Sequence, residues 1–143
     1  MNRLCLNMIV KNESDVIARC IRSVKQLLDY WVIVDTGSSD DTKEIILREL
    51  QDVPGELYER PWVHFAHNRN EALDLARGKA DYFLFMDADE TLVISDAFSK
   101  QDLTEDFYLF RLFERSSTDF YRISLIRDLP SWFWRGLFHE AID

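Results

Sequence analysis

The stretch YFLFMDADET, residues 82–91, runs from a block of apolar residues straight into two carboxylates, Asp87 and Asp89. An uninterrupted apolar run of this length is typical of a strand that is covered on both faces, as in a parallel sheet with helices on each side. The acidic pair marks the point where this strand leaves the sheet. We therefore expect an α/β fold with a polar site at the carboxyl end of residues 82–86.

The sequence before this stretch alternates short apolar runs with amphipathic segments, which is the pattern of strand–helix–strand units around a mostly parallel sheet. Pro54 and Pro61 bracket one of the short runs and place it at a sheet edge. Strands are predicted at residues 4–10, 31–34, 56–60 and 82–86, and helices at residues 17–28, 42–50 and 66–77.

Several residues have the chemistry of helix ends. Asn12 is the predicted N-cap of the first helix, and Asp41 with Glu44 has the form of a capping box for the second. Gly78 follows the third helix, where a left-handed residue ends a helix well.

The pattern changes after Glu90. FYLFRLFE at 107–114 and FYRISLIR at 120–127 predict the two strands of a hairpin, and an aromatic tail follows them. With 143 residues and 47% hydrophobic composition, the chain fits one compact domain.

Composition excludes several classes of function. A net charge of -9 argues against broad binding of nucleic acid, which needs clustered Lys and Arg. Cys5 and Cys20 are too few for a disulfide framework and are expected to be reduced core thiols. No segment approaches the roughly 18 apolar residues of a membrane span, and the N-terminus lacks a signal-peptide cleavage site. We expect a cytoplasmic protein without a transmembrane span.

Polar residues follow three of the predicted strands, at 11–13, 35–40 and 87–90. In open α/β sheets, ligands bind outside the carboxyl ends of the strands. If the first strand lies between the second and the fourth, Asp35 and Asp87 are two strand spacings apart, roughly 10 Å. This separation suits the reach from the base of a nucleoside diphosphate to its phosphates.

The two carboxylates of residues 87–89 suggest a metal site. On an extended strand, Asp87 and Asp89 would point the same way, because alternate residues share a face. Two such carboxylates repel each other unless a cation lies between them, and Mg²⁺ or Mn²⁺ suits oxygen ligands. The alternative is that Asp89 and Glu90 are solvated turn residues.

Five segments together resemble the family 2 glycosyltransferases of GT-A fold, and in particular the bacterial branch with VDTGSxD, ARN, DADE and VHE motifs. They are IVKNE at 9–13, VIVDTGSSDDT at 32–42, NRNEAL at 68–73, FMDADE at 85–90 and GLFHE at 136–140. The resemblance implies a mixed, mostly parallel sheet flanked by helices, with a C-terminal hairpin. It divides the single domain into a nucleotide-binding half, 1–90, and a short acceptor-side half, 91–143, which is minimal or truncated.

The resemblance also assigns roles to the motif residues on the donor side. Asp87 and Asp89 would bind a divalent metal, Mg²⁺ or Mn²⁺, that bridges the two phosphates of a nucleotide sugar. Asp35 would contact the base, usually uracil, and Arg69 would lie near the nucleotide, although Asn68 replaces the Ala of the family's motif. The nucleotide-binding residues implied are Val10, Asn12, Glu13, Asp35, Gly37, Arg69, Asp87 and Ala88.

The last motif supplies the remaining chemistry. The resemblance makes His139 a third metal ligand and Glu140 the base that removes the acceptor proton, and the two roles are interchangeable at this stage. Asp89 and Glu140 are thus the predicted catalytic residues. Several of these motif residues also have a purely structural alternative. His139 and Glu140 could be a surface pair, Asp35 a turn cap, and Arg69 a surface residue. Asn12 could cap a helix, and Glu13 could be an acid in the first turn of that helix.

The implied activity is a metal-dependent inverting transfer of sugar from a nucleoside diphosphate sugar, expected to be UDP-linked, to a hydroxyl of a glycan, lipid-linked or protein acceptor. One alternative is a non-catalytic or fragmentary nucleotide-binding module. Another starts from FLFMDADETL, which also resembles the nucleophile motif of haloacid-dehalogenase-type phosphatases, with Asp87 as nucleophile. That family needs a Lys and an acidic pair on later strands, and it leaves residues 1–80 unexplained.

The aromatic tail has three readings. Trp132, Phe133 and Trp134 are costly to expose, so they line the acceptor site, contact a membrane interface peripherally, or pack on the sheet. A membrane contact would place the protein at the inner face of the cell membrane.

Overall fold

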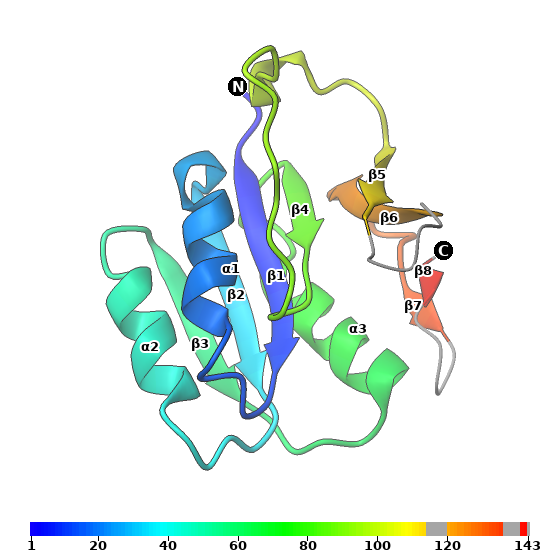
Figure 1. The fold of residues 1–143 in the computed structure, drawn as a ribbon. Helices are drawn as coiled ribbons and strands as arrows, with labels where there is room; N and C mark the ends of the chain where they lie inside the picture. The colour runs from blue at the N-terminus through cyan, green and yellow to red at the C-terminus, as the bar shows by residue number, and fades with distance from the viewer. Residues whose placement is uncertain (114–119, 136–140, 143) are drawn as a thin grey trace.

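A computed structural model describes residues 1–113, 120–135 and 141–142 of the chain (Figure 1). Its strands are β1 (Leu4–Val10), β2 (Tyr30–Asp35), β3 (Gly55–Glu59), β4 (Tyr82–Phe85), β5 (Phe107–Leu112), β6 (Phe120–Arg127), β7 (Trp134–Arg135) and β8 (Ala141–Ile142). Its helices are α1 (Ile17–Val24), α2 (Thr42–Glu49) and α3 (Phe65–Ala76), with short 3-10 turns η1 (Lys25–Leu27) and η2 (Lys100–Asp102).

The central sheet has six strands in the order β3-β2-β1-β4-β6-β5, and β7 pairs with β8 separately. Strands β1 to β4 are parallel to one another, whereas β6 runs antiparallel to β4 and β5 antiparallel to β6. This confirms the mixed, mostly parallel sheet, the central position of β1 between β2 and β4, and the hairpin. The pairing of Val10 with Asp35 and of Asn7 with Phe85 sets the carboxyl ends of β1, β2 and β4 at one edge.

Helices cover both faces of the parallel part of the sheet (Figure 1). Because side chains alternate along a strand, Leu6 and Met8 of β1 join the core under α1 and α2, while Cys5 joins the core under α3. Both cores are buried, so the apolar run at 82–85 is fully covered, as expected. Burial raises the pKa of the Cys5 thiol to about 12, consistent with a reduced core thiol.

Two of the predicted helix caps are wrong. Asn12 does not cap α1, which begins at Ile17 after Val16; instead Asn12 has a left-handed backbone (φ 52°) and accepts a hydrogen bond from Ser39 N (2.7 Å). The side chain of Asp41 makes no capping hydrogen bond, because the carboxylate one residue earlier, on Asp40, takes the backbone N–H of Thr42 (3.0 Å). Gly78, in contrast, has the predicted left-handed conformation, with φ 82°.

The predicted boundaries otherwise agree to within two residues, apart from the first helix. Residues 25–27, predicted as part of α1, tighten into the 3-10 turn η1 before β2. β3 lies at the edge of the sheet, as its flanking prolines indicate. Within the residues that the structure describes, no helix is both long and apolar enough to cross a membrane.

We predict that Gly55→Ala destabilises the sheet edge. A Cβ at this position would lie 2.3 Å from ring atoms of Trp31, which is buried and donates from Nε1 to Val53 O (2.8 Å). Moving the indole should cost about 1–3 kcal/mol in the free energy of unfolding, measured with urea. In a Trp31→Ala background the same substitution should cost much less; an equal cost in both backgrounds would show that the ring is not the obstacle.

Candidate functional site

A pocket of about 460 Å³ lies at the edge where β1 and β4 end. It brings together most of the predicted donor-side residues, which come from three separate segments of the chain. Among the residues that line it are Val10, Glu13, Arg69, Asp87, Ala88 and Asp89. Residues without a predicted site role also line it, namely Ile9, Lys11, Thr36, Trp62 and Phe65.

The acidic segment in this pocket is a turn rather than a continued strand. β4 ends at Phe85, and the turn is closed by a hydrogen bond from Glu90 N to Asp87 O (3.0 Å). The backbone N–H of Asp87 donates in turn to Glu90 Oε1 (2.8 Å). The expectation that Asp87 and Asp89 share a strand face is therefore wrong, because the chain bends here. Both residues nevertheless line the same pocket.

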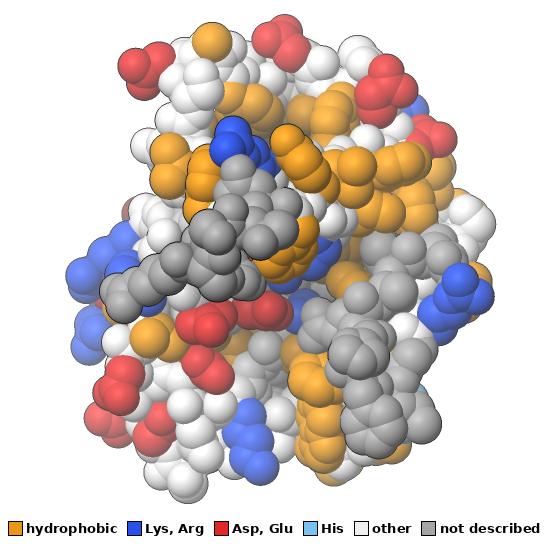
Figure 2. All heavy atoms as spheres, turned by 45° about the vertical axis from the view of Figure 1, so that its right-hand side comes forward, with side chains coloured by type: hydrophobic (Ala, Val, Ile, Leu, Met, Phe, Trp, Pro, Cys, Tyr) orange, Lys and Arg blue, Asp and Glu red, His pale blue; other side chains and the backbone are white. Residues whose placement is uncertain are grey.

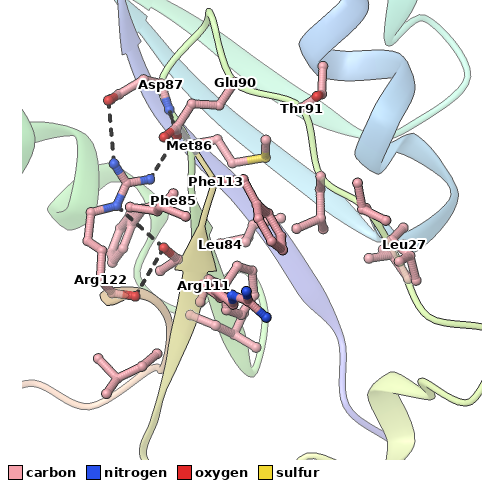
Figure 3. A pocket seen from close by; sticks show the side chains of 18 of the residues that line it. Leu27, Leu84, Phe85, Met86, Asp87, Glu90, Thr91, Arg111, Phe113 and Arg122 are labelled. Atoms are coloured by element: carbon pink, nitrogen blue, oxygen red, sulfur yellow. Dashed lines mark hydrogen bonds and ion pairs between the residues drawn. The ribbon is translucent and has the colours of Figure 1, made fainter. Parts of the chain in front are cut away.

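Two arginines hold the acidic turn, and Figure 3 shows one of them, Arg122, pointing toward Asp87 and Glu90. Arg69 Nη2 lies 2.7 Å from Asp87 Oδ1, and Arg122 Nη1 lies 3.6 Å from Asp87 Oδ2. Arg122 also pairs with Glu90 Oε1 at 2.7 Å. Glu90 is consequently a structural partner within the turn, so the alternative that it is a solvated residue is wrong. Asp89 is exposed, as the same alternative predicted.

Arg69 is buried, so the alternative of a surface arginine is wrong. Its guanidinium lies 5.2 Å from the ring centroid of Trp134 and is thus held between an aromatic face and the Asp87 carboxylate. Trp134 is itself buried and packs edge-on against Phe85, with ring centroids 4.9 Å apart. For Trp134, packing of the tail on the sheet is confirmed, while Phe133 is 50% exposed.

Three carboxylates, those of Glu13, Asp87 and Asp89, line the pocket together with Lys11 and Arg69. The pKa of Glu13 is raised, first by burial and then by the carboxylates of Asp89, Asp87 and Asp40. Glu13 precedes α1 rather than lying in its first turn, so its role as a first-turn acid is wrong. A cation bound among these side chains would offset the mutual repulsion of their negative charges.

The loop after β2 carries Asp35 and Gly37. Asp35 Oδ1 accepts hydrogen bonds from Gly37 N (2.9 Å) and Ser38 N (2.8 Å), which confirms the turn-cap role. Oδ2 is buried and has no hydrogen-bond partner among the described residues. Buried acceptors of this kind usually have a partner, so Oδ2 is available to a donor on a ligand. Asp35 and the exposed Gly37, with φ 122°, lie beside the pocket, and Thr36 between them reaches it.

Hydrogen bonds lock this loop to the one that follows β1. Asp40 accepts from the backbone N–H groups of Thr42 (3.0 Å) and Ser14 (3.2 Å), and the Thr42 hydroxyl accepts from Glu13 N (2.8 Å). These hydrogen bonds, from Thr42 above all, lower the pKa of Asp40 to about 2. Asn12, which is exposed and is not in the pocket lining, serves this junction through Ser39.

A second pocket of about 870 Å³ adjoins the first and shares Asp87 and Asp89 with it. Its walls are the segment after the acidic turn and the β5–β6 hairpin, including Met86, Phe113 and Arg122 (Figure 3). Phe113 is 70% exposed. Figure 2 shows acidic side chains grouped near the centre of one face, beside an area of hydrophobic side chains. The acidic turn therefore lies between two adjoining pockets, each lined by both apolar and charged side chains.

The donor set fits a magnesium-type ion in one mode only. His139 and Glu140 lie outside the described residues, and within the described ranges no group of three or more His, Cys, Asp or Glu side chains is arranged to hold a metal. Mg²⁺ is commonly held by one or two carboxylates together with substrate phosphates and waters. Asp87 and Asp89 meet that requirement, provided that a diphosphate completes the shell.

Sequence reasoning missed Arg122, Glu90, Trp62 and Phe65. Arg122 is 32 residues from Glu90 in the chain, and only the antiparallel pairing of β4 with β6 brings it to the turn. Trp62 and Phe65 stand just before and at the start of α3, with rings 5.0 Å apart. Two aromatic residues at the entry to the helix that carries Arg69 were the available signal.

The mixed, mostly parallel sheet flanked by helices is an α/β fold of the GT-A class. Residues 1–349 of TarS from Staphylococcus aureus superpose with a TM-score of 0.53 at 22% identity, over 62% of this chain and 28% of that one. Glucosyl-3-phosphoglycerate synthase from Mycobacterium tuberculosis, in complex with UDP, gives a TM-score of 0.51 at 19% identity, over 62% of this chain and 34% of that one. At these identities the likeness establishes the fold alone.

The sequence comparisons define the family. The model for Glycosyl transferase family 2 matches residues 5–98, so the chain belongs to that family. It is 31% identical to a TPR repeat-containing protein of Synechococcus elongatus, over all of this chain and 36% of that protein. It is also 31% identical to an uncharacterized glycosyltransferase of Rickettsia felis, over 88% of this chain and 40% of the relative. The chain thus spans less than half the length of these curated relatives.

We predict that Glu13→Gln stabilises the metal-free protein at neutral pH. Because the folded-state pKa of Glu13 lies above its ordinary value of 4.5, the ionised form is less favourable in the folded than in the unfolded protein. This penalty is present above the folded pKa and disappears below 4.5, where the side chain is protonated in both states. The variant should melt about 1–3 °C higher near pH 7 and equal to wild type near pH 4.

The matched control is Glu44→Gln, at an exposed position on α2. It should leave the melting temperature unchanged at both pH values. A Glu13→Gln protein that melts below wild type near pH 7 would show that Glu13 is held by favourable contacts and not strained by its acidic neighbours.

Proposed function

We propose that residues 1–143 form a single GT-A domain that binds a nucleotide sugar through its first ninety residues and transfers the sugar to an acceptor hydroxyl. The donor is a UDP-sugar, and the reaction inverts the configuration at the anomeric carbon. The observation that carries the proposal is the acidic turn Asp87–Glu90 at the carboxyl edge of the sheet, in one pocket with Glu13 and Arg69. Metal-bound diphosphate is the ligand class that such a pocket suits.

The metal would be Mg²⁺ or Mn²⁺, held by Asp87 and Asp89. When bound, it would act as a Lewis acid that stabilises the charge developing on the departing nucleoside diphosphate. Arg69, buried and fixed between Asp87 and Trp134, keeps the Asp87 carboxylate oriented and adds positive charge at the wall of the pocket. Fixed charge where charge develops is usually the largest catalytic term.

Uridine is favoured as the base by the loop after β2. The buried and unpartnered Oδ2 of Asp35 can accept a hydrogen bond from a ring N–H, which uracil carries. Trp62 and Phe65 offer flat faces for base or ribose in the same pocket. TarS, which shares the fold, has been crystallised with UDP and with UDP-GlcNAc.

The acceptor would approach through the second pocket. Since that pocket meets the first at Asp87 and Asp89, a hydroxyl bound there would lie beside the donor site. An inverting transfer requires that this hydroxyl attack from the side opposite the departing nucleotide. Asp89, exposed at this junction, and Glu140 are the proposed catalytic carboxylates, and His139 is the proposed third metal ligand. The apolar walls suit a lipid-linked acceptor at the inner face of the cell membrane, with glycan and protein acceptors as the other classes.

The two alternatives are weaker. A haloacid-dehalogenase-type phosphatase needs further parallel strands after the one that precedes Asp87. Among the described residues, β5 and β6 are instead antiparallel to their neighbours. A nucleotide-binding module without catalysis is favoured by one observation, the short span of the chain relative to its curated relatives. Binding of UDP-sugar without any release of UDP would support the module over the transferase.

We predict that UDP raises the melting temperature only when Mn²⁺ is present, and that ADP and GDP do so less. Asp87→Asn should weaken the Mn²⁺-dependent binding of UDP by about 10- to 100-fold. Asp35→Asn should weaken the binding of uridine compounds while leaving the Mn²⁺ concentration that binding requires unchanged. The measurement is a thermal-shift titration, with UDP release from UDP-sugars as the activity readout.

Asp96→Asn is the matched control, because Asp96 is exposed and lines neither pocket. It should bind UDP as the wild type does. A protein that shows no shift with any nucleotide, or an Asp87→Asn variant with wild-type turnover, would refute the proposed site.

A further inference from the structure

Arg122 occupies a position that neither the family motifs nor the donor-site proposal uses. It lies on β6 and reaches back across the sheet to the acidic turn, where it pairs with Glu90 Oε1 at 2.7 Å and lies 3.6 Å from Asp87 Oδ2 (Figure 3). Its Nε is within 3.5 Å of the Ser124 hydroxyl on the same strand. The hairpin therefore supplies a cation to the same carboxylate that is proposed to hold the metal.

The two arginines at Asp87 differ in how firmly they are fixed. Arg69 is buried, holds Asp87 at 2.7 Å and packs on Trp134, so it is part of the wall of the donor pocket. Arg122 is partly exposed, has the longer contact with Asp87 and lines only the second pocket. Its shorter contact is with Glu90, so it can release Asp87 and remain anchored on the turn.

Charge repulsion supplies the reason for such a group. Glu13, Asp87 and Asp89 line one pocket, and Glu90 closes the turn beside them. The pKa of Glu13 is raised first by burial and then by the nearby carboxylates of Asp89, Asp87 and Asp40. Without a cation, a cluster of this kind opposes folding. A guanidinium near Asp87 relieves the repulsion, but it is a like charge to any divalent ion that coordinates the same carboxylate.

We propose that Arg122 is a positioning residue that serves as counter-ion of the acidic turn in the metal-free protein and competes with the divalent cation for Asp87. The inference rests on the proposed function, since it assumes that Asp87 is a metal ligand. Entry of the ion displaces Arg122 from Asp87 and leaves it on Glu90. Because Arg122 belongs to β6, occupation of the metal site is thereby linked to the hairpin that forms the second pocket.

The test is the Mn²⁺ concentration that gives half of the maximal UDP binding, measured by tryptophan fluorescence in wild type, Arg122→Gln and Arg111→Gln. Arg111 is the matched control, because it lies on the neighbouring β5, lines the same pocket and carries the same charge, while its guanidinium packs over the Phe113 ring (4.5 Å). Arg122→Gln should lower the Mn²⁺ requirement about three- to tenfold. Arg111→Gln should change it less than twofold.

A second readout separates this role from a merely structural one. Without metal, Arg122→Gln should melt below wild type, because the turn loses its counter-ion, and added Mn²⁺ should close the gap. Glu90→Gln should have the opposite effect on binding and raise the Mn²⁺ requirement, since it removes the ion pair that draws Arg122 away from Asp87. Glu90→Gln should have a much smaller effect in the Arg122→Gln background.

The outcomes that overturn the inference differ from those that overturn the proposed function. If UDP binding by the wild type does not depend on Mn²⁺, both the metal site and the inference about Arg122 are refuted. If UDP binding is Mn²⁺-dependent but Arg122→Gln matches Arg111→Gln, the inference alone is wrong. An increased Mn²⁺ requirement in Arg122→Gln would also refute it, because Arg122 would then assist the metal–nucleotide complex rather than compete with the ion.

Discussion

The Asp87 carboxylate and the two guanidinium groups beside it form the contact on which the carboxyl edge of the sheet depends. A strand that is apolar on both faces ends in a turn rich in acids, and the turn persists because positive charge arrives from two distant elements. Arg69 comes from α3 and Arg122 from β6. The parallel and antiparallel parts of the sheet thus meet electrostatically at one residue. Burying charge without such pairing would be costly.

The fold also brings the loops around the pocket together. β1 lies within the parallel part and the residues at its end line the pocket, with the β2 loop on one side and the β4 turn on the other. Hydrogen bonds through Asp40 and Thr42 fix the loops of β1 and β2 to each other. The base, diphosphate and sugar of a nucleotide sugar would consequently meet parts of the protein that are tied together before the ligand binds, which lowers the entropic cost of binding.

The sequence predicted the parallel part of this protein well because its signals are local. Uninterrupted apolar runs predicted the strands, two prolines predicted the strand at the sheet edge, and Gly78 predicted the end of α3. The motif residues Glu13, Arg69 and Asp87 do line one pocket. The misses have a common physical cause. Asp40 displaced Asp41 in capping, the chain bent at Asp87–Glu90, and Arg122 arrived from another strand. Each depends on competition or on tertiary pairing that spacing along the chain does not encode.

We propose above that the acidic turn after β4 binds a divalent metal together with the diphosphate of the donor. The most direct test of this proposal is a crystal of the protein grown with UDP and Mn²⁺, with the ion located by its anomalous scattering. The account predicts an anomalous peak in contact with carboxylate oxygens of Asp87 and Asp89 and with both phosphates. Bound UDP with no ion at the turn, and with Asp87 still paired to both arginines, would contradict it.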